Sequence, residues 1–161
     1  MSERVTVTLT VNGRPVTRTA PAHTTLLAWL RDRASIYDPK PGCGEGVCGA
    51  CSVLVDGEPV SSCLLLAAQV DGAEIRTVSG LSFEGMPSPL QRAFLERGAA
   101  QCGFCTPGML TVATALLREG RELDRDEIRE ALHGNICRCT GYEAIVSAVA
   151  DVAMEGAVDG D

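Results

Sequence analysis

The spacing of the eight cysteines constrains this chain more than any other feature. They form two sets of four that follow one another without interleaving: Cys43, Cys48, Cys51 and Cys63, then Cys102, Cys105, Cys137 and Cys139. A chain of 161 residues can form one domain or two small ones. Domains of roughly 70–80 residues bury little apolar surface, so they usually need a metal or a disulfide in addition to their core. One set of cysteines per domain would meet that need.

The first set has the spacing C-x₄-C-x₂-C, followed by eleven residues and a fourth cysteine. This is the spacing of plant-type [2Fe–2S] ferredoxins. An oxidised cluster with four thiolates carries about two negative charges, and backbone N–H groups that turn toward sulfur stabilise them. Glycine permits the backbone angles and close approach that such a loop needs. Four glycines lie beside or between the first three cysteines: Gly42, Gly44, Gly46 and Gly49.

Other interpretations of this loop fit less well. Cys48 and Cys51 would make a thioredoxin-type pair only at a strand-to-helix junction, and the other two cysteines would then have no role. The four-residue gap suits structural zinc poorly, and disulfides need an oxidising compartment. Residues 44–49 match a dinucleotide-binding fingerprint in their glycines, but no apolar strand precedes them and Gln69 stands where an acidic residue is needed.

The second set has the spacing C-x₂-C, then 31 residues, then C-x-C. Each pair precedes a predicted helix, one starting at Pro107 and the other at Tyr142. Helix N-termini direct free N–H groups and a positive dipole end toward the thiolates, which suits an anionic cluster. Two helices over 107–134 would bring the chain back and so explain the long gap. On spacing alone, a structural zinc site remains the alternative.

Composition limits the kinds of partner and the cellular location that we expect for this protein. The formal charge is −7 and only 4% of the residues are aromatic, which argues against nucleic acid or an anionic membrane as the main partner. The N-terminal residues alternate between polar and apolar and lack the apolar run of a secretory signal. The longest apolar stretch, Cys63 to Ala68, is too short to span a bilayer. We therefore expect a cytoplasmic protein without membrane insertion, where cysteines favour metals over disulfides.

The hydrophobic periodicity changes from strand-like to helical near the middle of the chain. The first half predicts a small mixed sheet with one short helix at 26–30, capped by Thr24 or Thr25. Its predicted strands are 5–11, 14–20, 52–55, 59–66 and 74–78. The second half predicts helices at 90–97, 107–118, 126–133 and 142–154. We predict an α+β fold with domains 1–79 and 90–161, a linker at 80–89 rich in glycine and proline, and an acidic tail from Glu155 to Asp161.

Three segments resemble the small iron–sulfur subunit of the molybdenum hydroxylases. This family includes xanthine dehydrogenase, aldehyde oxidoreductases, carbon monoxide dehydrogenase and nicotinate-type dehydrogenases. The segments are PGCGEGVCGACSVLVDG (41–57), QCGFCTPGML (101–110) and NICRCTGYEAIVSAV (135–149). The likeness covers roughly residues 5–153 and includes all eight cysteines. It implies that the second set of cysteines holds iron rather than zinc.

The resemblance also implies a fold and a set of cofactors. The fold would be a β-grasp, plant-type ferredoxin-like domain followed by an all-α four-helix domain, each with one [2Fe–2S] cluster. Cys102, Cys105, Cys137 and Cys139 would hold the proximal cluster on the molybdopterin side, and Cys43, Cys48, Cys51 and Cys63 the distal cluster on the flavin side. Gln101 would contact the molybdopterin cofactor; without the resemblance it would be a polar loop residue. A large subunit would bind molybdopterin and a medium subunit FAD, in a dimer of heterotrimers.

The implied function is electron transfer inside a larger oxidoreductase. A partner would hydroxylate an aldehyde or an N-heterocyclic or purine-type substrate, and this chain would pass single electrons from molybdopterin through both clusters toward FAD. We predict no catalytic residue here, because His23 and His133 are the only histidines and fit a turn and a helix end. The alternative is a free-standing ferredoxin that diffuses between partners. Such a carrier has no need of a second, apolar helical domain with its own cluster.

Overall fold

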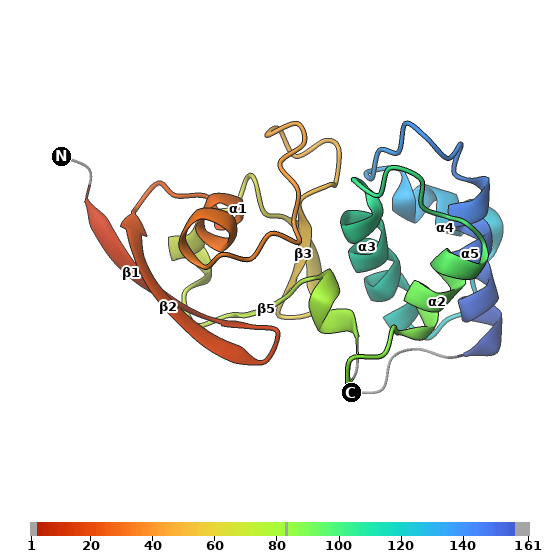
Figure 1. Ribbon diagram of the computed structural model, residues 1–161, viewed down its shortest axis with the longest axis horizontal. Coiled ribbons are helices and arrows are strands. Elements are labelled where there is room, and N and C mark those ends of the chain that lie inside the picture. Colours follow the sequence, from red (N-terminus) through yellow and green to blue (C-terminus); the bar gives the residue numbers. More distant parts are fainter. Residues whose placement is uncertain (1–2, 83, 157–161) are drawn as a thin grey trace.

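The first two strands follow from strict alternation of polar and apolar residues. In the computed structural model, which describes residues 3–82 and 84–156 (Figure 1), strand β1 (Arg4–Val11) pairs antiparallel with strand β2 (Arg14–Pro21). The apolar positions of β1, which include Val7 and Leu9, are buried. Asn12 and Gly13 both have positive φ, at 49° and 75°, which is the conformation of a two-residue hairpin turn. The predicted hairpin is confirmed.

Three shorter strands complete a mixed sheet. They are β3 (Ser52–Val55), β4 (Glu58–Ser61) and β5 (Glu74–Arg76), and the strand order is β2-β1-β5-β3-β4. The central pair β1–β5 is parallel and the others are antiparallel. This arrangement is the β-grasp topology that we expected. The predicted strands at 59–66 and 74–78 were too long, because the chain turns after Ser61 to bring Cys63 toward Cys51, and a 3₁₀ turn begins at Val78.

One short helical segment packs on this sheet. Helix α1 (Leu26–Ala28) continues as a single π-helical turn (Trp29–Arg33), and the Thr25 hydroxyl accepts a hydrogen bond from the Ala28 N–H at 3.2 Å. Thr25 is therefore the cap that the sequence left open between two threonines. Leu26, Trp29 and Leu30 are fully buried and join the strand side chains in one hydrophobic cluster.

The described part of the second half contains four α-helices close to their predicted positions. They are α2 (Pro89–Glu96), α3 (Thr106–Arg118), α4 (Arg125–Leu132) and α5 (Glu143–Glu155). Capping boxes start α2 at Ser88 and α4 at Asp124, and each satisfies the free N–H groups of the first turn. The interior contains Met109, Ile128 and Ile145, all fully buried. The expected α+β fold, a ferredoxin-like half followed by a helical half, is confirmed.

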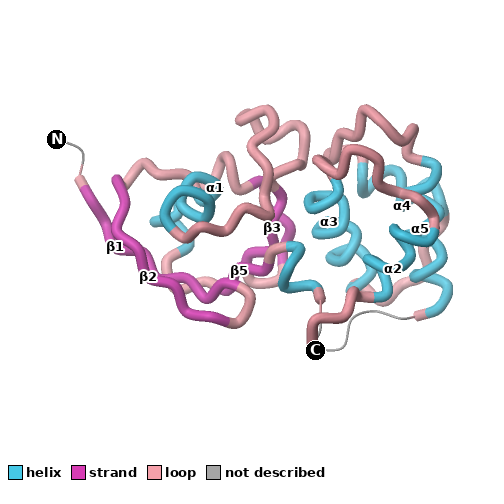
Figure 2. The backbone as a smooth tube through the Cα atoms, viewed as in Figure 1, coloured by secondary structure: helices cyan, strands magenta, loops and turns pink. Residues whose placement is uncertain are grey.

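The two halves lie side by side and share a boundary at β3 and α3 (Figures 1 and 2). Leu54 of β3 packs into the hydrophobic cluster of the helices, so the sheet and the helical core are in direct contact. The domain limits 1–79, 80–89 and 90–161 stay a prediction. Most of the acidic tail, residues 157–161, lies outside the described residues. Within 3–82 and 84–156, no helix is long and apolar enough to cross a membrane.

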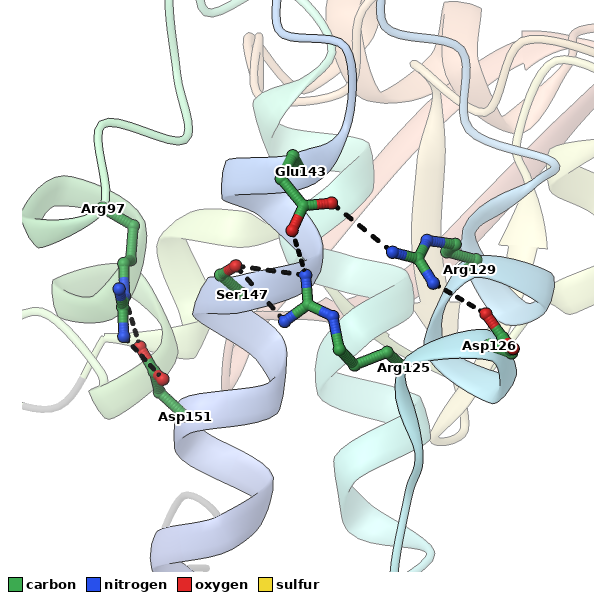
Figure 3. A network of polar contacts seen from close by, with 7 residues as sticks. All are labelled: Arg97, Arg125, Asp126, Arg129, Glu143, Ser147 and Asp151. Atoms are coloured by element: carbon green, nitrogen blue, oxygen red, sulfur yellow. Dashed lines mark hydrogen bonds and ion pairs between the residues drawn. The ribbon is translucent and has the colours of Figure 1, made fainter.

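Ion pairs connect α5 to α4 and to Arg97, the residue that follows α2 (Figure 3). The guanidinium of Arg97 binds both carboxylate oxygens of Asp151, at 2.6 and 2.8 Å, and this bidentate contact lowers the pKa of the Asp151 carboxyl. On the other side, Glu143 accepts from Arg125 and Arg129, which come from α4. These exposed pairs contribute little energy each. They link the exposed side of α5, the helix that follows the last pair of cysteines, to its neighbours.

Candidate metal centres

The first cysteine loop directs backbone N–H groups at sulfur. The amides of Glu45 and Val47 donate to Cys43 Sγ at 3.3 and 3.4 Å, and the Cys43 amide donates to Cys48 Sγ at 3.3 Å. Gly44 and Gly46 have φ angles of 72° and 74°, which turn these amides inward. The amide hydrogen bonds, that of Glu45 first, lower the pKa of Cys43 to about 6. The loop therefore stabilises negative charge on sulfur.

The four thiols of this loop approach one another as two pairs. Cys43 contacts Cys48, and Cys51 contacts Cys63. Burial raises the pKa of Cys63 to about 11, with a further contribution from its contact with Cys51. A cation bound to this half-buried thiol would favour its ionised form.

The second group of cysteines shows the same pairwise arrangement. Cys102 and Cys139 lie 3.6 Å apart, sulfur to sulfur, and Cys105 contacts Cys137. Burial raises the pKa of Cys105 to about 12. Burial also acts to raise the pKa of Cys137, but hydrogen bonds from the Thr140 hydroxyl and from nearby amides outweigh it and the net shift is downward. This half, too, provides hydrogen bonds to sulfur.

Pairwise approach distinguishes between kinds of metal site. A structural zinc ion needs four donors about 2.0–2.3 Å from a single point, so its ligands converge. Among the described residues, no three His, Cys, Asp or Glu side chains converge in this way. In a two-iron cluster the four thiolates are divided between two irons. None of the eight cysteines, all of which lie in the described ranges, forms a disulfide. The thiols, which lie in pairs and receive hydrogen bonds at sulfur, fit two-iron clusters.

Comparison with known proteins identifies both halves. A family model described as "2Fe-2S iron-sulfur cluster binding domain" matches residues 9–81, and one described as "[2Fe-2S] binding domain" matches residues 77–150. The chain is 52% identical over 150 residues to the nicotine 6-hydroxylase small subunit of Paenarthrobacter nicotinovorans, covering 93% of this chain and 90% of that one. The chain belongs to the small iron–sulfur subunits of the molybdenum hydroxylase family. The zinc alternative for the second half is thereby removed.

Two further comparisons support the same family membership. The xanthine dehydrogenase iron-sulfur-binding subunit of Escherichia coli O157:H7 is 48% identical over 152 residues, with 93% of this chain and 95% of that one covered. The structure of quinoline 2-oxidoreductase from Pseudomonas putida 86 superposes with a TM-score of 0.89 at 43% identity, over 98% of this chain and 100% of the matched one. This small subunit is thus an electron-transfer component of a multi-subunit oxidoreductase. Its relatives are subunits of larger enzymes, which favours a subunit over a free-standing ferredoxin.

The structure places the other residues that the sequence singled out in a loop, in a turn and at a helix end. Gln101 is exposed, in the loop between α2 and α3, next to the exposed Cys102. His23 is exposed in a turn, and His133 caps the end of α4 with its ring nitrogen against the Glu130 carbonyl. Neither histidine lies in a cysteine loop.

Sequence reasoning missed three residues of the second cysteine loop. Asn135 is buried and donates through Nδ2 to the Gly49 carbonyl. The Tyr142 hydroxyl accepts from the Cys137 amide at 2.8 Å, and the Thr140 hydroxyl contacts Cys137 Sγ at 3.1 Å. All three belong to the segment NICRCTGY, so the cysteines on either side were the available signal.

Proposed function

We propose that Cys43, Cys48, Cys51 and Cys63 hold one [2Fe–2S] cluster and that Cys102, Cys105, Cys137 and Cys139 hold the other. The observation that carries this assignment is the pairwise approach of thiols at two sites with sulfur-directed amides. When bound, a [2Fe–2S] cluster accepts and releases one electron. The chain's own residues supply the ligands and the hydrogen bonds that stabilise the added negative charge, and they bury Cys51 and Cys137.

We propose that electrons enter at the second-half cluster, on the molybdopterin side, and leave from the first-half cluster toward FAD. The exposed thiols at the two sites support two separate docking surfaces. Next to the second site lie the exposed apolar side chains Phe104 and Ile136, which are 47% and 50% exposed. Next to the first lie Val47 and Leu64, at 59% and 61%. Apolar side chains exposed around a metal site favour burial by a partner protein.

Gln101 is proposed to contact the molybdopterin cofactor of a large partner subunit. Its exposure beside Cys102 leaves its amide available to a group that docks on this loop. A medium subunit would carry FAD, in a cytoplasmic dimer of heterotrimers. Relatives of this chain are named for nicotine hydroxylation and for caffeine and xanthine dehydrogenation. We accordingly propose an N-heterocyclic or purine-type substrate for the complex.

The test is to purify the native complex and to compare Cys63→Ala with Cys105→Ala. The wild-type complex should contain two irons and two inorganic sulfides for each cluster and show two distinct electron paramagnetic resonance (EPR) signals after reduction. Each variant should lose one signal and keep the other, so each serves as the control for the other. Cys105→Ala should also abolish turnover while molybdenum stays bound. Normal turnover in Cys105→Ala, or zinc in place of iron, would contradict the assignment.

The same preparation tests the partners. Mass spectrometry of the intact complex should find this chain together with a molybdopterin-binding and an FAD-binding subunit. A fully active monomer of about 17 kDa would instead favour a diffusing carrier.

A further inference from the structure

The two cysteine loops touch each other through a pair of hydrogen bonds. The Ile136 amide donates to the carbonyl of Cys48 at 2.9 Å, and Asn135 Nδ2 donates to the carbonyl of Gly49 at 3.1 Å. Two consecutive residues of the second loop thus bind two consecutive residues of the first. We call this four-residue contact the loop seam. Both cysteine loops lie along the same edge of the molecule, at the top of Figure 1.

Close packing leaves no room in the loop seam. Gly49 has φ = +67°, and a β-carbon there would lie 2.3 Å from Asn135 Nδ2. A β-carbon on Gly108, in the first turn of α3, would lie 2.1 Å from the Gly49 carbonyl oxygen. Gly108 is inside a helix, where glycine costs on the order of 1 kcal/mol relative to alanine. The close approach of α3 to the Gly49 carbonyl accounts for glycine at this position.

Asn135 is held rigidly from the helical side. Its side chain is buried, with only 3% of the residue exposed. Its backbone N–H donates to the Leu132 carbonyl at 2.9 Å, and its carbonyl accepts from the Tyr142 hydroxyl at 3.2 Å. The same hydroxyl accepts from the Cys137 amide. Asn135 is therefore fixed to the backbone of Cys137 at one end and to the first cysteine loop at the other.

We propose that Asn135 is a positioning residue that fixes the separation and the electronic contact of the two clusters. The inference rests on the proposed assignment of the cysteines. Across the loop seam, the backbones of Cys48 and Cys137 are joined by one hydrogen bond and the Ile136 residue. Electron tunnelling decays more slowly through covalent and hydrogen bonds than through empty space. As long as the loop seam keeps this hydrogen bond formed, the separation of the two cysteine sites stays fixed.

A purely structural role for Asn135, joining two domains, is the competing explanation. It predicts lower stability and nothing specific to the clusters. The chain offers a matched control, because its only other asparagine, Asn12, makes two side-chain hydrogen bonds to Thr77, at 2.8 and 2.9 Å, inside the ferredoxin-like half. Asn12→Ala should lower the free energy of unfolding without disturbing either cysteine loop.

The experiment compares Asn135→Ala and Asn12→Ala in the complete purified complex. The first readout is the splitting that the two reduced clusters impose on each other's EPR signals, which depends on their separation and on the bonds between them. The second is hydrogen–deuterium exchange of the peptide that contains Ile136. We expect Asn135→Ala to keep its iron and both signals but to lose much of the splitting. Exchange at Ile136 should rise by roughly two- to tenfold, the range that loss of one net hydrogen bond permits.

A second pair of variants covers the case in which Asn135→Ala does not assemble. Gly108→Ala pushes α3 away from the Gly49 carbonyl, whereas Gly134→Ala meets nothing within 4 Å and serves as its control. Gly108→Ala should reduce the splitting and Gly134→Ala should leave it unchanged. Unchanged splitting in both Asn135→Ala and Gly108→Ala, or no splitting in a wild-type complex with both clusters reduced, would overturn the inference. Absence of iron from the wild type would instead overturn the cysteine assignment on which it rests.

Discussion

Thr140 offers a direct test of how the second cysteine loop sets a reduction potential. Its hydroxyl accepts a hydrogen bond from the Tyr142 amide at 3.2 Å, so the hydroxyl proton is free to point elsewhere. At 3.1 Å, Cys137 Sγ lies in the position to receive it. The bond already stabilises negative charge on this sulfur, because it contributes to lowering the pKa of Cys137. Thr140→Val keeps the shape of the side chain and removes the donor.

The direction and size of the change in reduction potential follow from the negative charge that reduction adds to the cluster. Reduction adds one electron to the cluster, so a donor to a ligand sulfur favours the reduced form, and its removal should lower the potential. A hydrogen bond is worth on the order of 1 kcal/mol net, and more with a charged acceptor. If about 1 kcal/mol of this is gained only on reduction, the shift is roughly 40 mV for a one-electron couple, since a tenfold change in equilibrium corresponds to about 59 mV. We expect Thr140→Val to lower the potential of the second-half cluster by roughly 30–60 mV.

The assay is a redox titration of the complex followed by EPR, which reports each cluster separately. Thr140→Ser is the matched control, because it keeps the hydroxyl and should stay close to the wild-type potential. The first-half cluster provides an internal reference that should not move in either variant. An unchanged or raised potential in Thr140→Val, with iron content intact, would refute the reasoning.

Two further predictions concern stability and metal removal. Leu132→Ala, at a residue only 1% exposed in the helical core, should lower the free energy of unfolding by about 2–5 kcal/mol. Leu95→Ala, at a residue that is 73% exposed, should change this free energy by less than about 0.5 kcal/mol. The urea concentration at which half of the cluster absorbance is lost measures both effects. Equal effects of the two variants would contradict the assigned core. Removal of iron with a chelator and a reductant should speed hydrogen exchange in residues 42–50 and 134–141, whose amides and side chains bond to sulfur, and leave the β1–β2 ladder protected. Equal loosening of that ladder would show that the sheet depends on the metal.

Much of the fold could be predicted because local sequence and tertiary structure agree. The alternation in β1 and the Asn12–Gly13 turn each specify the hairpin on their own. Asp124 with Glu127 specifies the start of α4 in the same way. The overlong strand prediction at 59–66 shows where this agreement ends. Its apolar residues continue past Ser61, but the chain must turn there to bring Cys63 to Cys51.

In the candidate sites, too, local features could be predicted and contacts between distant residues could not. Cysteine spacing is a local signal, so the division of the eight cysteines into two groups could be predicted from their positions in the chain. The seam between them depends on contacts across 86 residues, from Asn135 to Gly49, and no periodicity or motif encodes such a contact. Gly108 was the one available sign, since a glycine within a predicted helix is costly and often marks a close approach.

One strained backbone position lies beside these contacts. Gly141 and Tyr142 are consecutive residues with φ of 66° and 68°, and a tyrosine in the left-handed region costs on the order of 1–2 kcal/mol. The strained turn places the Tyr142 hydroxyl where it accepts from the Cys137 amide and donates to the Asn135 carbonyl. Strain of this kind persists only where surrounding contacts enforce it. Its position, one hydrogen bond from a proposed ligand residue and one from the loop seam, indicates that the fold accepts a local cost to hold the two cysteine loops together.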